Sequence, residues 1–388
     1  MRIVLFYHSI VSDWNHGNAH FLRGVMAELL RRGHEVLAYE PEDGWSRRRL
    51  LHEHGVAGLG AFRQAYPMLE SRLYRLGELD LDEALEGADL VIAHEWNEPS
   101  LIARLGERRR SNGRGDGERR RLLFHDTHHR AVSAPKEMER YDLSGYDGAL
   151  VFGEVLREIY LRRGWVREAW TWHEAADTRV FAPVAQSESG PPTDDLVWIG
   201  NWGDGERAEE LREFLLRPVK DLGLRATVYG VRYLKRALAM LAEAGIRYGG
   251  WLPNAAAPAV FSRARVTVHI PRRPYVETLP GIPTIRVFEA LACGIPLVCS
   301  PWDDREGLFT PGRDYLTAGS GTEMRERLRW LLDHPEEASA QAARGLATIR
   351  RRHTCRHRVD ELLAICRGLG LESETKAAEE HTKGGIPA

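Results

Sequence analysis

The residues whose types and spacing are most specific for chemistry lie between Gly281 and Gly294. Thr284 follows a loop of glycine and proline and is a good N-cap, and Gly294 marks the end of the helix. Backbone N–H groups and positive dipole at such a helix start suit a diphosphate, and Arg286 adds a cation. Glu289, about one turn further, can accept two hydrogen bonds from a vicinal diol such as a ribose. The alternative is an amphipathic helix with incidental charges.

Two histidines stand where predicted strands end. His94 follows the apolar run at 90–93, and His125 with Asp126 follows the run at 122–124. Ligands bind at the carboxyl ends of the strands in parallel α/β sheets. His94 and His125 are therefore candidates for a catalytic site, and Asp126 is placed to orient His125. A purely structural role for these histidines is the alternative.

A metal site is not predicted. His125, His128 and His129 lie close in sequence, but no cysteine or carboxylate stands at metal-ligand spacing from them. The D-x-D spelling at 80–82 is better explained as a helix start, because acidic residues favour first turns. We therefore expect neither a metal nor another cofactor.

Near the N-terminus, Gly17 and Asn18 precede a helix predicted over 19–32. A glycine at this place lets a ligand approach the start of the helix closely. A plain tight turn is the alternative interpretation.

The elements that must position these residues alternate between strand and helix. The predicted strands are Ile3–Tyr7, Glu35–Tyr39, Leu90–Ala93, Leu122–Phe124, Gly148–Phe152, Leu196–Ile199, Ala226–Tyr229, Arg265–Ile270 and Pro296–Cys299. Helices are predicted between them, including most of 46–86 and the stretch Glu206–Leu216. This alternation predicts an α/β protein with doubly wound sheets.

The alternation restarts after a segment rich in proline, serine and aspartate, which predicts two domains. The expected boundaries are 1–181 for the first domain, 182–195 for the linker and 196–371 for the second domain. The last helix is expected to pack back on the first domain. Residues 372–388 are polar without apolar periodicity, which predicts a disordered tail.

Composition excludes several classes of protein. The net charge of −2 produces no global field toward nucleic acid or an acidic membrane. Four cysteines without metal or C-x-x-C spacing indicate reduced thiols and a cytoplasmic protein. No apolar run is long enough for a membrane span. The basic stretch Arg108–Arg121 is interpreted as a solvated loop; a patch for an anionic acceptor or a membrane surface is the alternative.

The run Arg286–Gly294 resembles the donor signature of group 1 glycosyl transferases, and most closely that of the CgeB-like (spore maturation type) branch. Further segments follow in the order of that branch, from about residue 196 to residue 365. They are Trp198–Asn201 with Arg207, Tyr229–Gly230, Gly249–Pro253, Trp302, Glu306–Phe309, Pro311–Arg313, Asp333–Glu336 and Arg352–Arg358.

The resemblance implies a GT-B architecture, in which two Rossmann-like domains face each other across a cleft and the second holds a nucleotide sugar. It implies that Glu289 binds the donor ribose and that Arg207 lies near the diphosphate. It also implies that His125 faces the reacting sugar, which makes His125 the leading catalytic candidate and places Asp126 to orient it or to receive the acceptor proton. The remaining expected donor contacts are Gly17, Asn18, Gly200, Trp251, Leu252, Pro283, Thr284, Ile285 and Arg286.

One position departs from the related retaining enzymes of family four. Those enzymes carry a second glutamate eight residues before the ribose-binding one, near the donor sugar, and the corresponding residue here is Gly281. Glu277 lies in the same loop and is the candidate replacement.

These features predict transfer of a hexose-type unit from a nucleotide diphosphate sugar to an unknown glycan, lipid, protein or small-molecule acceptor. The reaction is expected to need no metal and to retain the anomeric configuration. Two alternatives stay open. One is a nucleotide-sugar 2-epimerase, which binds the same donor without an acceptor. The other is a catalytically silent sugar-binding or assembly protein.

Overall fold

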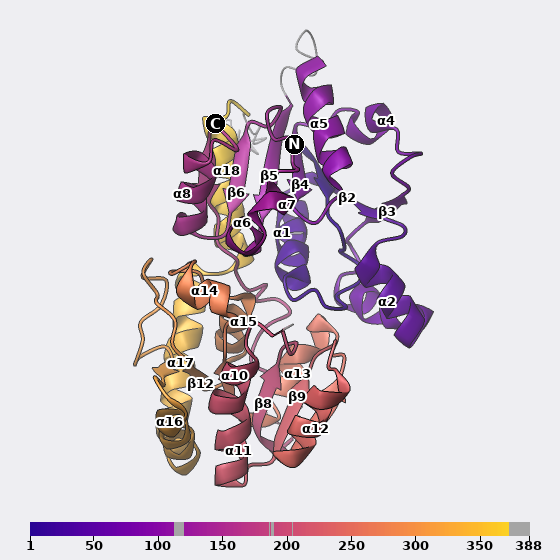
Figure 1. Ribbon diagram of the computed structural model, residues 1–388. Coiled ribbons are helices and arrows are strands. Elements are labelled where there is room, and N and C mark those ends of the chain that lie inside the picture. Colours follow the sequence, from indigo (N-terminus) through magenta and orange to yellow (C-terminus); the bar gives the residue numbers. More distant parts are fainter. Residues whose placement is uncertain (112–119, 186, 188–189, 204, 372–388) are drawn as a thin grey trace, which may run out of the picture.

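The computed structural model describes residues 1–111, 120–185, 187, 190–203 and 205–371. In these residues the chain is an α/β protein with two parallel sheets, one in each half (Figure 1). The strand order is β3-β2-β1-β4-β5-β6-β7 in the first sheet and β10-β9-β8-β11-β12-β13 in the second. In each sheet the order reverses beside the first strand of that half. Such a switch point opens a crevice at the carboxyl ends of the strands.

The first sheet is covered by helices on both faces. Its strands are β1 (Arg2–Phe6), β2 (Glu35–Pro41), β3 (Ser71–Tyr74), β4 (Leu90–His94), β5 (Arg121–Asp126), β6 (Gly148–Val151) and β7 (Ala169–Thr171). The helices of this half are α1 (Ala19–Arg31), α2 (Trp45–His54), α3 (Gly60–Ala65), α4 (Leu81–Leu85), α5 (Pro99–Ser111), α6 (Arg130–Ser133), α7 (Pro135–Met138) and α8 (Glu154–Arg162). The register of β4 and β5 sets His94 beside His125.

The second half repeats this plan. Its strands are β8 (Asp194–Ile199), β9 (Ala226–Tyr229), β10 (Ile246–Gly250), β11 (Ala264–His269), β12 (Leu297–Cys299) and β13 (Leu316–Thr317). Its helices are α10 (Ala208–Leu211), α11 (Arg217–Leu222), α12 (Lys235–Glu243), α13 (Ala257–Phe261), α14 (Arg273–Glu277), α15 (Ile285–Cys293), α16 (Gly321–Asp333) and α17 (Pro335–Arg352), and the chain continues into α18 (Cys355–Gly368).

The strands that the sequence pattern does not predict are the four at the sheet edges: β3, β7, β10 and β13. Edge strands bury fewer side chains, so they lack the apolar runs that mark central strands. β3 has only one buried residue and corrects the expectation that 46–86 is mostly helical. The helix expected over Glu206–Leu216 is α10, a π-helical turn over Arg212–Leu216, and α11.

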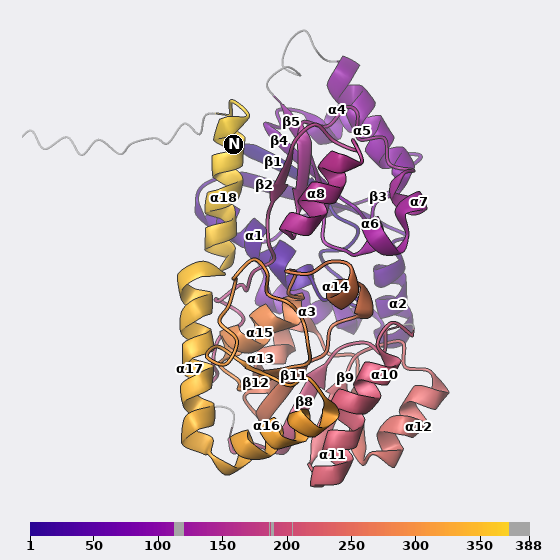
Figure 2. The same cartoon turned by 60° about the vertical axis from the view of Figure 1, so that its left-hand side comes forward.

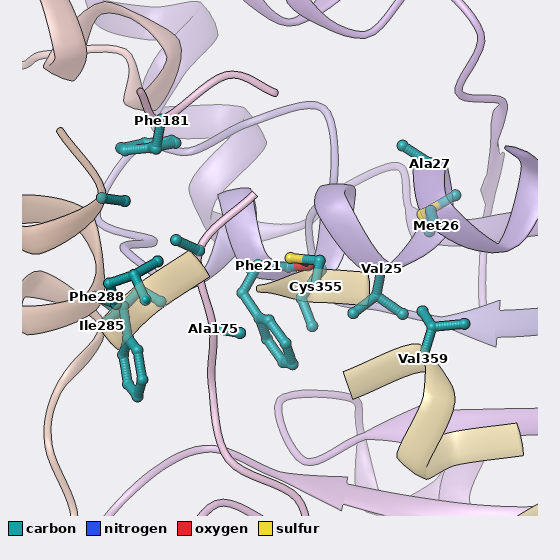
Figure 3. Packing of buried hydrophobic residues seen from close by; sticks show 14 of the residues in the cluster. Phe21, Val25, Met26, Ala27, Ala175, Phe181, Ile285, Phe288, Cys355 and Val359 are labelled. Atoms are coloured by element: carbon teal, nitrogen blue, oxygen red, sulfur yellow. Dashed lines mark hydrogen bonds between the residues drawn. The ribbon is translucent and has the colours of Figure 1, made fainter. Parts of the chain in front are cut away.

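The terminal helices run along both halves (Figure 2). α17 packs on α15 of the second half, whereas α18 packs on α1 of the first. Val359 and Cys355 of α18 lie in one buried cluster with Phe21 and Val25 of α1 (Figure 3). The chain therefore crosses between the halves a second time.

Candidate functional site

A cavity of about 1400 Å³ opens between the two sheets and is lined by residues of both halves. The loops that follow β1, β4 and β5 form one wall. The loops that follow β8, β9 and β11, together with the start of α15, form the other. Both switch points therefore face this cavity, as expected for the ligand site of doubly wound sheets.

The start of α15 is the most specific part of the second wall. Thr284, Ile285 and Arg286 line the cavity, and Thr284 holds the N-cap position. The Thr284 hydroxyl lies 3.0 Å from Nε2 of His269 and caps no backbone group, contrary to the usual role of an N-cap threonine. The Thr284 side chain thus leaves the start of the helix uncapped. The N–H of Val287 donates to the carbonyl oxygen of Thr284 at 3.0 Å, and the N–H of Ile285 lies beside the Glu174 carboxyl.

Gly17 brings the first wall against this helix start. A Cβ atom at Gly17 would lie 3.3 Å from Cγ2 of Ile285 and 3.4 Å from Nη2 of Arg286. Gly17 and Asn18 both line the cavity. The glycine permits a close approach of the two walls, which a larger residue would oppose.

Glu289 lies behind Arg286, fully buried, and does not line the cavity. Its carboxylate pairs with the Arg286 guanidinium and lies 2.9 Å from Nδ1 of His20 on α1, across the domain boundary. Burial alone would raise the pKa of Glu289, but Arg286 and His20 outweigh it and the pKa lies below its ordinary value. A buried carboxylate in this position holds the guanidinium at the start of α15.

Arg207 lines the cavity as a second cation. Its guanidinium donates to the carbonyl oxygens of Ile270, at 2.9 Å, and Asn201, and lies over the Trp198 ring at 5.0 Å. Burial, with Arg272 nearby, lowers the pKa of Arg207 to about 9, so it stays charged at neutral pH.

The loop after β10 forms the end of the cavity furthest along the second sheet. Trp251, Leu252 and Gly200 line it. Asp13 of the first half accepts hydrogen bonds from Nε1 of Trp251, at 3.2 Å, and from the backbone N–H of Asn254, at 3.0 Å. The loop is thereby held against the first half, with an indole on the cavity wall.

The residues predicted as catalytic are buried behind the first wall and do not line the cavity. His125 packs between the Phe21 and Trp172 rings, and burial lowers its pKa to about 3. His94 lies 3.1 Å from Oγ1 of Thr127, and Asp126 accepts a 2.6 Å hydrogen bond from the Tyr160 hydroxyl. β4 continues through His94 and β5 through Asp126, so these three side chains belong to the strands and are packed in the interior.

The cavity is instead reached by residues just beyond those strand ends. Thr127, His128 and His129 line it after β5, and His8 and His16 line it after β1. None of these was predicted as a site residue, although His128 and His129 were considered as metal ligands. His8 directly follows the predicted strand Ile3–Tyr7, as His94 follows the apolar run at 90–93, so the same strand-end rule would have found it.

Two other expected site residues do not line the cavity. Glu277, the candidate replacement for a carboxylate at Gly281, is exposed on α14. Pro283 is buried beside the site without lining the cavity. Glu174, which was not singled out, does line it.

In the basic stretch at 108–121, the described residues 108–111 and 120–121 do not line the cavity, and 112–119 fall outside the described residues. Arg108 pairs with Asp82, and Arg109 lies 3.3 Å from the Asp147 carboxylate. No group of at least three potential metal ligands occurs among the described residues. In the same part of the chain, no helix combines the length and apolar character needed to cross a membrane.

Residues 207–364 match a family model described as glycosyl transferase-like. No curated protein sequence matches the chain. Sucrose-phosphate synthase from Thermosynechococcus elongatus is similar over 95% of this chain and 99% of its own, with 14% identity and a TM-score of 0.64. HepE of Anabaena, in complex with UDP and glucose, is similar over 95% of this chain and 100% of its own, with 12% identity and a TM-score of 0.65.

An alpha-glucosyltransferase in complex with UDP-glucose and DNA containing an abasic site is similar over 95% of this chain and 99% of its own. Its identity is 13% and its TM-score is 0.65. These likenesses confirm the GT-B fold predicted for the chain.

Proposed function

We propose that the chain transfers a sugar from a nucleotide diphosphate sugar to an acceptor. The observation that carries the proposal is the start of α15, where uncapped N–H groups and Arg286 face a cavity enclosed by both halves. The glycosyl transferase-like match over 207–364 contains this helix and supports the same reaction. Such a site binds the diphosphate and stabilises the negative charge that it gains when the sugar leaves.

The donor is expected to lie along the second wall. Its base contacts Trp251 and Leu252, and its diphosphate lies at Arg286 and the start of α15. Glu289 is then a positioning residue, because its carboxylate holds Arg286 and does not reach the cavity. We propose UDP as the nucleotide and a hexose as the sugar, since HepE was solved with UDP and glucose.

Arg207, Arg286 and the helix start together supply positive charge, so we propose a reaction without a metal ion. Retention of the anomeric configuration and membership of the CgeB-like branch are proposed from the sequence resemblance alone.

Thermal denaturation with a panel of nucleotide sugars tests the proposal. UDP-glucose at 100 times its Kd should stabilise the folded chain by about 2.7 kcal/mol, and GDP-, dTDP- and CMP-sugars should act more weakly. NMR of the products formed from the bound donor, with water as the acceptor, then reports sugar release and its anomeric configuration. No stabilisation by any panel member would contradict the proposed site. Binding without any sugar release would instead favour a silent sugar-binding protein.

A further inference from the structure

Glu174 is a buried carboxyl group that the donor contacts described so far do not use. It stands three residues after β7, is 2% exposed and lines the cavity. Its Oε1 atom is buried and has no hydrogen-bond partner within the described part of the chain. An unpaired buried carboxyl oxygen costs free energy, so its presence on a cavity wall points to a ligand.

The backbone around Glu174 is held on both sides. Trp172 donates from Nε1 to the carbonyl oxygen of Arg358 at 2.8 Å, and His173 lies 2.9 Å from Oε2 of Glu306. The N–H of Ala176 donates to the carbonyl oxygen of His353 at 3.0 Å. These contacts come from the second half and from the terminal helices. They hold the segment that carries Glu174 at the boundary between the two domains, which helps to preorganise a binding group.

The structure also explains why this carboxyl is not supplied from residue 281. Gly281 has φ +94°, a conformation that favours glycine. A Cβ atom there would lie 3.1 Å from both Cγ and Oε1 of Glu306, which already fills the space. Because Glu277 is exposed, the loop before α15 offers no carboxyl to the cavity. Glu174 approaches from the opposite domain, beside the backbone N–H of Ile285.

The diphosphate of a donor is charged and its sugar is not, and this difference indicates which part Glu174 could contact. A carboxylate repels a diphosphate, for which Arg286 and Arg207 provide cations. Burial raises the pKa of Glu174 well above its ordinary value, and Glu289 adds to the rise. Arg286 and the N–H of Ile285 oppose this rise without reversing it. The oxygen atoms of the carboxyl accept hydrogen bonds, which sugar hydroxyl groups can donate.

We propose that Glu174 contacts hydroxyl groups of the transferred sugar, which rests on the function proposed above. The transferred sugar is bonded to the diphosphate, so in the proposed binding mode it also lies near the start of α15, where the Glu174 carboxyl enters the cavity from the first domain. The second domain holds the nucleotide and the diphosphate. Glu174 thereby distinguishes a nucleotide sugar from the free nucleoside diphosphate.

Calorimetric titration of UDP-glucose and of UDP into wild type, Glu174→Ala and Glu174→Gln tests this division. If another nucleotide sugar of the panel stabilises the chain more than UDP-glucose does, that nucleotide sugar and its nucleoside diphosphate are titrated in place of UDP-glucose and UDP. Glu174→Ala should raise the Kd for UDP-glucose about tenfold relative to the Kd for UDP. The Kd for UDP itself should stay within about twofold of the wild-type value. Glu174→Gln should keep most of the affinity, because the amide oxygen of glutamine also accepts hydrogen bonds.

Glu98→Ala is the matched control, since it removes an exposed carboxylate that also lines the cavity, and it should leave the ratio of the two Kd values unchanged. An unchanged ratio in Glu174→Ala would overturn the sugar contact, and so would an equal loss for both ligands. The proposed function would be contradicted instead if the wild-type protein bound none of the nucleotide sugars of the panel and none of their nucleoside diphosphates. The melting temperature of each ligand-free variant shows whether it is folded.

Discussion

The two walls of the cavity differ in the charge of their buried groups. On the second wall, Arg207 and Arg286 are cations beside a helix start. On the first wall, His8 and His16 are imidazoles, and burial lowers the pKa of both, that of His8 to about 3. At neutral pH these two imidazoles are therefore uncharged, whereas Arg207 and Arg286 on the second wall are positive. A donor with a charged diphosphate and a neutral sugar matches this asymmetry, because its diphosphate is attracted to the second wall.

The asymmetry also assigns different work to the two domains. Both ring nitrogens of His16 lack a hydrogen-bond partner in the described structure, although the residue is 7% exposed and lines the cavity. Neutral imidazoles can donate or accept, which suits hydroxyl groups of a sugar or an acceptor. We infer that the second domain determines nucleotide affinity, whereas the first determines which sugar and acceptor are used.

The largest expected effect is that of Arg286→Ala on nucleotide binding. Loss of a charge-assisted contact should cost about 1.5–3 kcal/mol, which raises the Kd for UDP about 10- to 150-fold in calorimetric titration. Uridine, which has no phosphate, should bind equally to both proteins. Because Glu289 loses its buried partner, the ligand-free variant should also melt earlier.

Arg325→Ala is the control for this measurement, since Arg325 pairs with Asp221 at 2.7 Å and does not line the cavity. Arg286→Lys keeps the charge and should recover part of the UDP affinity. A Kd for UDP within twofold of wild type in Arg286→Ala would show that the positive wall is not the phosphate site.

The second wall could be predicted from sequence because its main part is one continuous segment. The loop, N-cap position, Arg286 and the Gly294 end of α15 follow from local rules of helix formation. The central strands of both sheets follow from their apolar runs. Glu289 shows the limit: its type and spacing were clear, but whether it faces the ligand or His20 depends on the packing of α1 against α15.

The first wall could not be predicted in the same way, since it is assembled from loops after different strands. Whether a strand ends one residue earlier or later decides which side chain reaches the cavity, and local patterns place such ends poorly. His125 was therefore chosen where His128 and His129 line the site. Glu174 gave no signal, because its surroundings come from residues far away in sequence.

His125→Phe tests whether the buried histidines of the first domain are structural. The folded pKa of about 3 lies below the ordinary value of 6.5, so only the unfolded chain binds a proton between them. The contribution of this residue is present above pH 6.5 and is lost as pH falls toward 3. Between pH 7 and pH 5 the loss is about 2 kcal/mol, and the phenylalanine variant should lose that much less in urea denaturation.

The same variant should bind UDP-glucose and release sugar as wild type does, because its ring is packed between Phe21 and Trp172 behind the cavity. His52→Phe, on the exposed side of α2, serves as the surface comparison. A fall in sugar release by a factor of ten or more, with unchanged stability at pH 7, would restore His125 as a catalytic residue.

The smallest effect is expected at the base end of the second wall, from Trp251→Ala. Its indole lines the cavity and also donates to Asp13, so removal should cost about 1 kcal/mol of stacking with the base. The Kd values for uridine and for UDP, measured by NMR titration, should both rise by a factor of about five. In Arg286→Ala, by contrast, only the Kd for UDP should rise. Trp330→Ala removes an exposed indole from α16, which does not line the cavity, and should change neither ligand. If uridine binding is unchanged, Trp251 serves only the contact with Asp13, and the positive wall binds the phosphates without a base site at this end.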